Sequence, residues 1–314
     1  MIIAKSAQSI LSIILMISTG YILTARGWFD ENSSELLVKL VVKLSFPLML
    51  IQNIMSNFNK DNLLNASRGL IVPFLSMTLC YLMGAAFSRI LKVKKERQGV
   101  FKLMFFTSNT IYMGLPVNIA LFGEKSLPYA LLYYIANTIF FWTLGIYIID
   151  QNGSQKYYKI FSVESIKRIF SPSLTAFFLA TVLILLNIKL PPFLMDTFKY
   201  MGNLTTPLSM LFIGITIRSI DLKQVRFDRD MAGVLFGRFF VSPLTILLIS
   251  LAFPLPKLMR DVFIIQASMP VMTNTAIITR AYNTDYEYAA IMVTITTIVS
   301  VLIIPFYMLL LNNI

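Results

Sequence analysis

The feature that most constrains this sequence is a series of long apolar runs. A helix needs about 20 apolar residues to cross the ~30 Å hydrocarbon core of a bilayer. Runs near that length lie at residues 6–25, 38–58, 69–89, 99–122, 127–149, 171–188, 199–218, 231–253, 258–281 and 287–311. Hydrophobic residues make up 57% of the chain and charged residues 13%, against about 25% charged residues in soluble domains. We therefore expect an all-α membrane protein with ten transmembrane helices.

Composition excludes several classes of function. The chain has no histidine and one cysteine, Cys80, which removes histidine-based catalysis and any internal disulfide. The acidic residues fall in loops or at the ends of the apolar runs, so no buried carboxylate relay or intramembrane protease is expected. We predict no enzyme, no metal and no cofactor. The net charge of +12 fits loops that obey the positive-inside rule, and we expect no nucleic-acid partner.

The distribution of Lys and Arg predicts the topology. Most of them fall in the loops that follow odd-numbered helices, so these loops are expected in the cytoplasm and both termini outside the plasma membrane. A polar stretch at 150–170 divides the chain into five helices at 1–149 and five at 171–314. With five helices in each half, the second half must be inserted upside down relative to the first. This is the layout of an inverted repeat.

Short sequence echoes support an internal duplication. LSFPL resembles LTTPL, IVPFL resembles VSPLT, and SNTI resembles TNTA. The paired segments are Leu44–Leu48 with Leu204–Leu208, Ile71–Leu75 with Val241–Thr245, and Ser108–Ile111 with Thr273–Ala276. Their separations of 160, 170 and 165 residues are nearly constant, and they occur in the same order in both halves.

The fourth and ninth runs contain polar and helix-breaking residues at matching places. They are Ser108, Asn109, Thr110, Gly114 and Pro116 in the fourth, and Pro270, Thr273, Asn274 and Thr275 in the ninth. Proline and glycine weaken a helix, and each freed backbone group costs several kcal/mol in hydrocarbon unless it is satisfied. We expect Gly114, Pro116 and Pro270 to interrupt these helices. Interrupted helices at corresponding places in two halves indicate the binding site of a transporter.

The chemistry of these residues suits an anion. The ends of interrupted helices expose backbone N–H groups, and Asn109 and Asn274 add neutral side-chain donors. The same oxygen atoms also suit a cation, and simple helix packing is the other interpretation, so polarity alone leaves the ligand open. Arg238 lies about two turns inside the eighth run. It is either a partner for a substrate anion or a side chain that extends to the lipid headgroups.

The residues SNTIYMGLP (Ser108–Pro116) resemble the helix-4 signature N-T-x-x-M-G-[IL]-P of the auxin efflux carrier family. QASMP (Gln266–Pro270) and TNTA are similar to its ninth helix in the bacterial branch, and PLSMLFIGI (Pro207–Ile215) to its seventh. The chain departs from the plant members because it lacks a long central loop. Residue 108 is Ser, where plant carriers tend to have Pro.

The resemblance implies two inverted five-helix repeats of the kind found in NhaA and bile-acid symporters, with helices 4 and 9 crossing. A transport domain of helices 3–5 and 8–10 would move like an elevator against a scaffold of helices 1, 2, 6 and 7, which also forms a homodimer. The resemblance places Asn109 on the substrate carboxylate, with malate as one candidate. We take Ser108, Thr110, Thr273, Asn274 and Thr275 as its companions. The alternatives are a sodium-coupled symporter of the bile-acid type and a non-transporting membrane sensor or scaffold.

Overall fold

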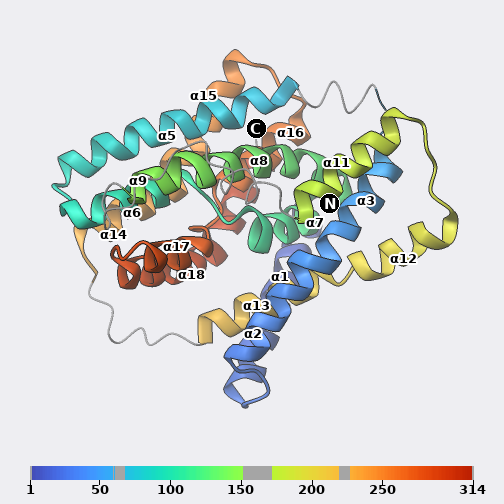
Figure 1. Ribbon diagram of the computed structural model, residues 1–314, viewed down its shortest axis with the longest axis horizontal. Coiled ribbons are helices and arrows are strands. Elements are labelled where there is room, and N and C mark those ends of the chain that lie inside the picture. The colour runs from blue at the N-terminus through green and yellow to red at the C-terminus, as the bar shows by residue number, and fades with distance from the viewer. Residues whose placement is uncertain (1, 59, 61–67, 151–171, 219–226, 313–314) are drawn as a thin grey trace.

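The computed structural model describes residues 2–58, 60, 68–150, 172–218 and 227–312, and within these ranges the regular structure is helical throughout (Figure 1). Residues 151–170 of the predicted linker lie outside the described ranges. Four described helical segments are long and apolar enough to cross a membrane: Ile71–Ile90, Glu124–Ile149, Arg229–Ala252 and Tyr286–Leu311. Shorter apolar helices occur at Leu11–Ala25 and Pro172–Leu185. The chain is therefore a multi-pass helical membrane protein, while the expected number of ten spans stays a prediction.

The first half of the chain is built from helices and short helical turns. In order they are α1 (Ile2–Ala25), α2 (Glu31–Leu40), the π-helical turn η1 (Val41–Ser45), α3 (Phe46–Asn57), the 3-10 turn η2 (Arg68–Leu70), α5 (Ile71–Ile90), α6 (Lys95–Phe106), the π-helical turn η3 (Thr110–Gly114), α7 (Leu115–Phe122), the 3-10 turn η4 (Glu124–Ser126), α8 (Leu127–Phe140), the π-helical turn η5 (Phe141–Gly145) and α9 (Ile146–Asp150).

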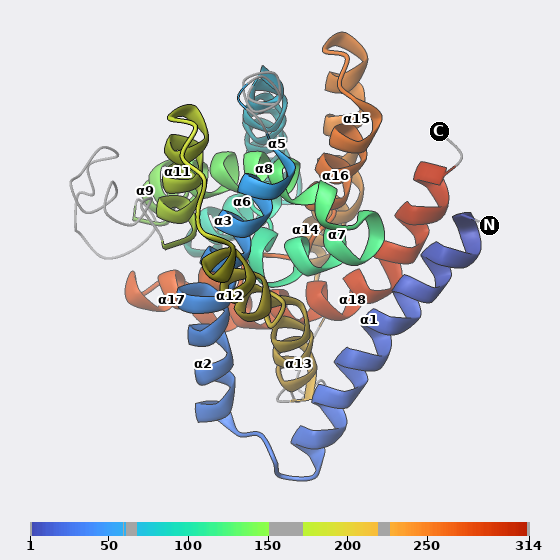
Figure 2. The same cartoon turned by 90° about the vertical axis from the view of Figure 1, so that its right-hand side faces the viewer.

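The second half has a similar order of elements. They are α11 (Pro172–Leu185), α12 (Pro192–Gly202), α13 (Thr205–Arg218), α14 (Arg229–Phe236), the π-helical turn η7 (Gly237–Val241), α15 (Ser242–Ala252), α16 (Lys257–Ala267), α17 (Asn274–Ala281) and α18 (Tyr286–Asn312). The start of α1 and the end of α18 lie on the same side of the molecule (Figure 2).

Three of the π-helical turns end two residues before a proline. The prolines are Pro47, Pro116 and Pro243, which follow η1, η3 and η7. Proline has no N–H and its ring clashes with the carbonyl one turn earlier. A π-helical turn pairs residues five apart and is wider than an α-helical turn, as in the 2.9 Å bond from Gly114 N–H to the Asn109 carbonyl. The wider turn accommodates the proline, so the helix continues through it.

Two helix pairs make the closest contacts between the halves: α1 with α13, and α3 with α11. In the first pair, a Cβ atom added at Gly20 would collide with the backbone of Leu211, and one at Gly214 with the backbone of Ile17. Small residues allow membrane helices to approach this closely. These helices, with α2 and α12, gather at one side of the molecule (Figure 1).

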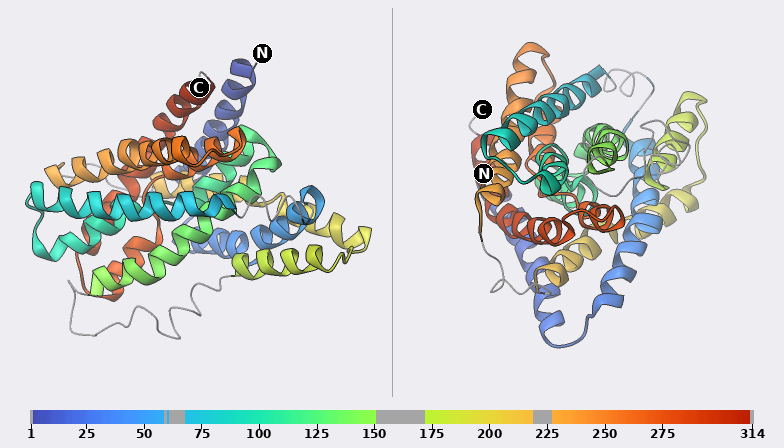
Figure 3. Two further views of the ribbon diagram at one scale, coloured as in Figure 1. Left: turned by 90° about the horizontal axis from the view of Figure 1, so that it is seen from above. Right: turned by 60° about the vertical axis from the view of Figure 1, so that its left-hand side comes forward.

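The echoed segments of the two halves lie against each other. The Thr205 hydroxyl donates to Ser45 Oγ at 3.1 Å, which joins the start of α13 to the end of η1. Ser76 Oγ and Thr245 Oγ1 are 2.6 Å apart, where α5 and α15 run side by side (Figure 3). All four side chains are buried. The first contact joins members of two echoed segments, and the second joins Thr245 of an echoed segment to Ser76, which directly follows the matching one.

Arg97 ties three helices together at one end of the molecule. It lies in α6, and its guanidinium donates at 2.8 Å to Asp285, directly before α18, and at 2.8 Å to Asp228, directly before α14. Asp230 lies 3.5 Å away. Asp228 and Asp285 also accept backbone N–H groups from the first turns of α14 and α18. The arginine therefore fixes two helix N-termini beside the start of α6.

Candidate functional site

Two helices in corresponding positions are interrupted. α6 ends at Phe106 and the helix resumes at Thr110, leaving Thr107–Asn109 non-helical. α16 ends at Ala267 and α17 begins at Asn274, leaving residues 268–273 between them. Of the three predicted breakers, the structure places Pro270 inside an interruption. Gly114 and Pro116 lie after the first one, in the continuous η3–α7 helix.

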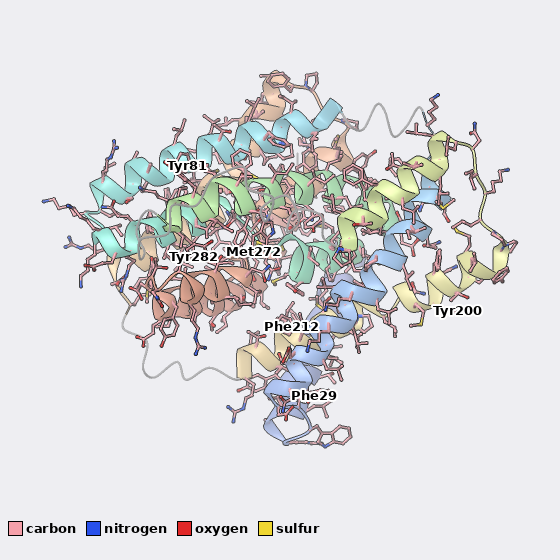
Figure 4. All side chains as sticks on the ribbon, in the orientation of Figure 1. Phe29, Tyr81, Tyr200, Phe212, Met272 and Tyr282 are labelled. Atoms are coloured by element: carbon pink, nitrogen blue, oxygen red, sulfur yellow. The ribbon has the colours of Figure 1, made fainter. Side chains whose placement is uncertain are left out.

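The two interruptions contact each other through Asn109. Its backbone N–H donates to the Pro270 carbonyl at 2.8 Å, and its side-chain Nδ2 donates to Thr273 Oγ1 at 3.0 Å. Its Oδ1 accepts the N–H of Tyr112 at 3.2 Å and so caps η3. An amide NH₂ has two hydrogens, and among the described residues the second one meets no acceptor. Met272, from the second interruption, lies near the middle of the molecule (Figure 4).

Asn137 on α8 holds the first interruption from behind. Its Oδ1 accepts the N–H of Ser108 at 2.9 Å, and its Nδ2 donates to the Ser108 carbonyl at 3.0 Å. Asn137 is fully buried. Sequence reasoning missed this residue, although a polar amide inside a 26-residue apolar span is costly in a membrane and is itself a functional signal.

The second interruption has its own support. Thr296 on α18 accepts the N–H of Val271 at 3.1 Å. Gln266, in the last turn of α16, reaches across and donates to the carbonyls of Thr110 and Ala130 at 3.4 Å each. Each interruption is thus held by a side chain of the next long helix in its own half, and Gln266 joins the two interrupted helices.

Gly114 makes room for the Gln266 side chain. A Cβ atom at Gly114 would collide with Gln266 Oε1 and would lie 2.9 Å from its Cδ. Within the described part of the chain, Gln266 Oε1 is buried and accepts no hydrogen bond, and the same holds for Thr275 Oγ1. Buried polar atoms without partners are uncommon in native structures and call for an explanation. These two lie in the interrupted helices α16 and α17.

The predicted site residues are partly brought together. Asn109 and Thr273 bond directly. Asn137, which bonds to Ser108, also places its Nδ2 3.5 Å from Thr110 Oγ1. Asn274 and Thr275 follow Thr273 as the first residues of α17. The Asn274 side chain is half-buried and no hydrogen bond from it to a described residue is present, whereas Thr275 is fully buried.

Of the two predictions for Arg238, the structure contradicts the one that extends its side chain to the headgroups, and contact with a substrate anion stays a prediction. Arg238 is fully buried, so it does not extend to the headgroups. Its guanidinium donates to the carbonyls of Phe105 at 3.2 Å, Ala267 at 2.5 Å and Met269 at 3.3 Å. These carbonyls belong to the ends of α6 and α16 and to the residues that follow α16.

The helix ends give the contact between the two interruptions a polarity. The C-terminal ends of α6 and α16 carry free carbonyls and partial negative charge, and both contact Arg238. The N-terminal ends of η3–α7 and α17 carry partial positive charge, and the N–H groups of Thr110, Tyr112 and Thr275 are already bonded to Ser108, Asn109 and Met272. These helices begin at Thr110 and Asn274, next to the Asn109–Thr273 contact. The arrangement offers neutral hydrogen-bond donors to a negatively charged group.

Comparison with known proteins gives the same class. A family model described as "Membrane transport protein" matches residues 6–308. An uncharacterized transporter of Methanocaldococcus jannaschii is 27% identical over 305 residues, which cover 95% of this chain and 96% of that protein. The Escherichia coli transporter YfdV, also uncharacterized, is 21% identical over 87% of each chain. A Rhizobium meliloti protein provisionally named a malonate transporter is 24% identical over 62% of this chain and 61% of its own length.

The family match covers nearly the whole chain and agrees with the helical membrane architecture and the two interrupted helices described above. The chain belongs to the auxin efflux carrier family of membrane transport proteins and is a transporter, not an enzyme.

Proposed function

We propose that this transporter is a secondary carrier that moves a small organic anion, a carboxylate, across the plasma membrane by alternating access. The observation that carries the proposal is the meeting of two half-helix N-termini at the Asn109–Thr273 contact. Half-helix N-termini that point at an anionic group are a recurring way to bind a carboxylate at mid-membrane.

In this proposal the amides of Asn109 and Asn274 donate to the carboxylate. Asn109 keeps one amide hydrogen free after its bond to Thr273, and Asn274 is half-buried at the first residue of α17. Thr110, Thr273 and Thr275 add hydroxyls beside them, and Ser108 is held in place by Asn137. Neutral donors avoid the expense of a charged side chain in direct contact with substrate inside the membrane.

The two halves are proposed to be inverted repeats. The supporting observation is that two contacts join echoed segments, Ser45 with Thr205 and Asn109 with Thr273, and a third joins Ser76, directly after an echoed segment, to Thr245. Residues related by a two-fold axis touch one another where they lie near that axis. Inverted repeats that meet at the binding site are the common design of alternating-access carriers.

The moving part is proposed to comprise α5–α9 and α14–α18, and the scaffold α1–α3 and α11–α13. The close contacts of Gly20 and Gly214 support a compact scaffold, and Arg97 supports a single moving unit because its bonds join α6 to Asp228 and Asp285. The proposal also includes elevator-type movement, a homodimer formed by the scaffold, and both termini outside the cell.

The test is a thermal-shift screen followed by flux measurements. The purified protein would be heated with malonate, malate and other organic acids, because a ligand that binds only the folded state raises its stability. Malonate is included because of the name of the Rhizobium relative. Uptake of any acid that binds would then be measured in proteoliposomes, with sodium or choline as the outer cation.

The decisive variant is Asn109→Ala, and Asn57→Ala is its matched control. Asn57 ends α3 and is exposed, and among the described residues its side chain bonds to Asn53 in the preceding turn. We expect Asn109→Ala to abolish flux while the protein still folds in the membrane, and Asn57→Ala to transport normally. Undiminished flux by Asn109→Ala would remove Asn109 from the site. Sodium-dependent flux would favour the symporter alternative, and binding without flux would favour the sensor.

A further inference from the structure

Arg238 is the largest of the fully buried side chains in the described part of the chain. Its guanidinium donates to three carbonyl oxygens and lies close to the Tyr133 side chain, and among the described residues no carboxylate forms an ion pair with it. An unpaired charge in a membrane interior is expensive and is usually functional. Its retention here therefore needs a reason beyond helix packing.

The three carbonyls come from two different interrupted helices. Phe105 lies in the last turn of α6, Ala267 ends α16, and Met269 follows in the second interruption. The last four carbonyls of a helix have no partner within it, and the helix dipole adds partial negative charge there. Met269 directly precedes Pro270, whose carbonyl accepts the Asn109 N–H. The arginine thus bonds to the residue next to Pro270, and Pro270 contacts Asn109 of the proposed anion site.

In carriers built from interrupted helices, unwound carbonyls and half-helix C-terminal ends are the groups that coordinate a coupling sodium ion. In this structure those groups surround a guanidinium. We propose that Arg238 is a tethered cation that occupies the place of a coupling metal ion at the crossing. The inference rests on the proposed function and deepens it, because it predicts that anion transport requires no sodium.

The local sequence explains how Arg238 reaches this place. Gly237 precedes it, and a Cβ atom there would collide with the Phe105 ring. The backbone of η7 can therefore lie directly against α6. The π-helical turn at Gly237–Val241, which accommodates Pro243, includes Arg238 itself. The positive charge is thus fixed to the packed helices and cannot leave, whereas a metal ion would bind and dissociate.

The experiment measures the thermal unfolding of purified wild type, Arg238→Ala and Arg238→Lys. Each protein is unfolded in sodium chloride, choline chloride or guanidinium chloride at about 20 mM, because a bound ion stabilises the folded state in proportion to its occupancy. We expect the stability of wild type to be the same in sodium and choline. Arg238→Ala should unfold several degrees lower, and guanidinium should restore roughly half of the loss by filling the vacated place. Arg238→Lys should be intermediate, because an ammonium keeps the charge but not the planar set of donors.

Arg218→Ala is the matched control, since Arg218 ends α13 and is exposed; it should not respond to guanidinium. Stabilisation of wild type by sodium, or an Arg238→Ala variant that guanidinium helps no more than choline, would overturn the proposal. If Arg238→Ala does not fold, hydrogen exchange of Arg238→Lys decides: faster exchange at both 105–109 and 267–271 supports the role, and unchanged exchange there contradicts it.

These measurements use no substrate. A protein that binds no organic anion but shows the guanidinium response would refute the proposed function and leave the tethered cation standing. A protein that binds organic anions only with sodium would refute the tethered cation and leave the proposed function standing.

Discussion

The backbone N–H of Asn109 and the carbonyl of Pro270 are joined by a 2.8 Å hydrogen bond between two chain segments that lie 161 residues apart in sequence. Neither group can bond within its own helix, because both lie where the helix is interrupted. In a membrane an unsatisfied backbone group costs several kcal/mol. The two interruptions therefore stabilise each other, and changes at one are expected to be felt at the other.

Asn109→Asp should fold but lose affinity for organic anions. The carboxylate can still accept the Tyr112 N–H that caps η3, and Asp is as good an N-cap as Asn. It loses both amide hydrogens and places a negative charge where the anion would bind. We expect at least a tenfold weaker affinity, or more than about 1.4 kcal/mol, measured by thermal shift. An unchanged affinity would show that the anion binds elsewhere.

Asn137→Leu should destabilise the protein by about 1–3 kcal/mol, because it leaves the buried N–H of Ser108 without a partner, whereas the Ser108 carbonyl keeps its bond from the Thr110 N–H. Denaturant unfolding in detergent would measure the change. The control is Thr143→Ala, which removes a hydroxyl that donates to Ile139 one turn earlier, its bond within the described part of the chain, and should change stability little. Equal effects of the two variants would contradict the support role of Asn137.

Gly114→Ala should displace the Gln266 amide and weaken its bonds to the Thr110 and Ala130 carbonyls. We expect a loss of about 1–3 kcal/mol, typical of overpacking. The same change in a Gln266→Ala background should cost much less, because the colliding side chain is gone. A double-mutant cycle measures this coupling, and simple additivity would exclude the collision as the cause.

Arg97→Gln should loosen one end of α14 and α18 together. The change leaves Asp228, Asp230 and Asp285 close to one another without their shared cation. The groups are partly exposed, so the expected loss is about 1–2 kcal/mol, above that of a single surface pair. Hydrogen exchange at residues 229–233 and 286–290 would detect it. Lys39→Gln, which breaks the exposed pair with Glu35, is the control and should leave both segments unchanged.

Much of this architecture could be predicted from the sequence because membrane spans need long apolar runs. The helical membrane class and the family follow from local residues, and the predicted SNT and TNT segments do lie at the two interruptions, while their role in binding stays a prediction. The place of the first interruption was not predicted. Gly114 and Pro116 were expected to break the helix, but a π-helical turn accommodates Pro116 and the interruption lies at Thr107–Asn109. There, Asn137 and the Pro270 carbonyl accept the backbone N–H groups that the helix leaves without partners.

Contacts between distant helices account for the rest. Asn137 reads as one polar residue in an apolar span until Ser108 is placed beside it. The position of Arg238 in its run predicted either substrate contact or headgroup contact, because nothing local shows that α6 and α16 both end within its reach. Such partners are set by tertiary packing and have no signal in local sequence.

The contact between α1 and α13 has a mechanical consequence. Where Gly20 and Gly214 bring the two backbones together, no side chain lies between them, so rotation of a side chain cannot adjust the contact at these two points. We therefore expect α1 and α13 to move together as one rigid unit, so that a conformational change takes place at other helix contacts.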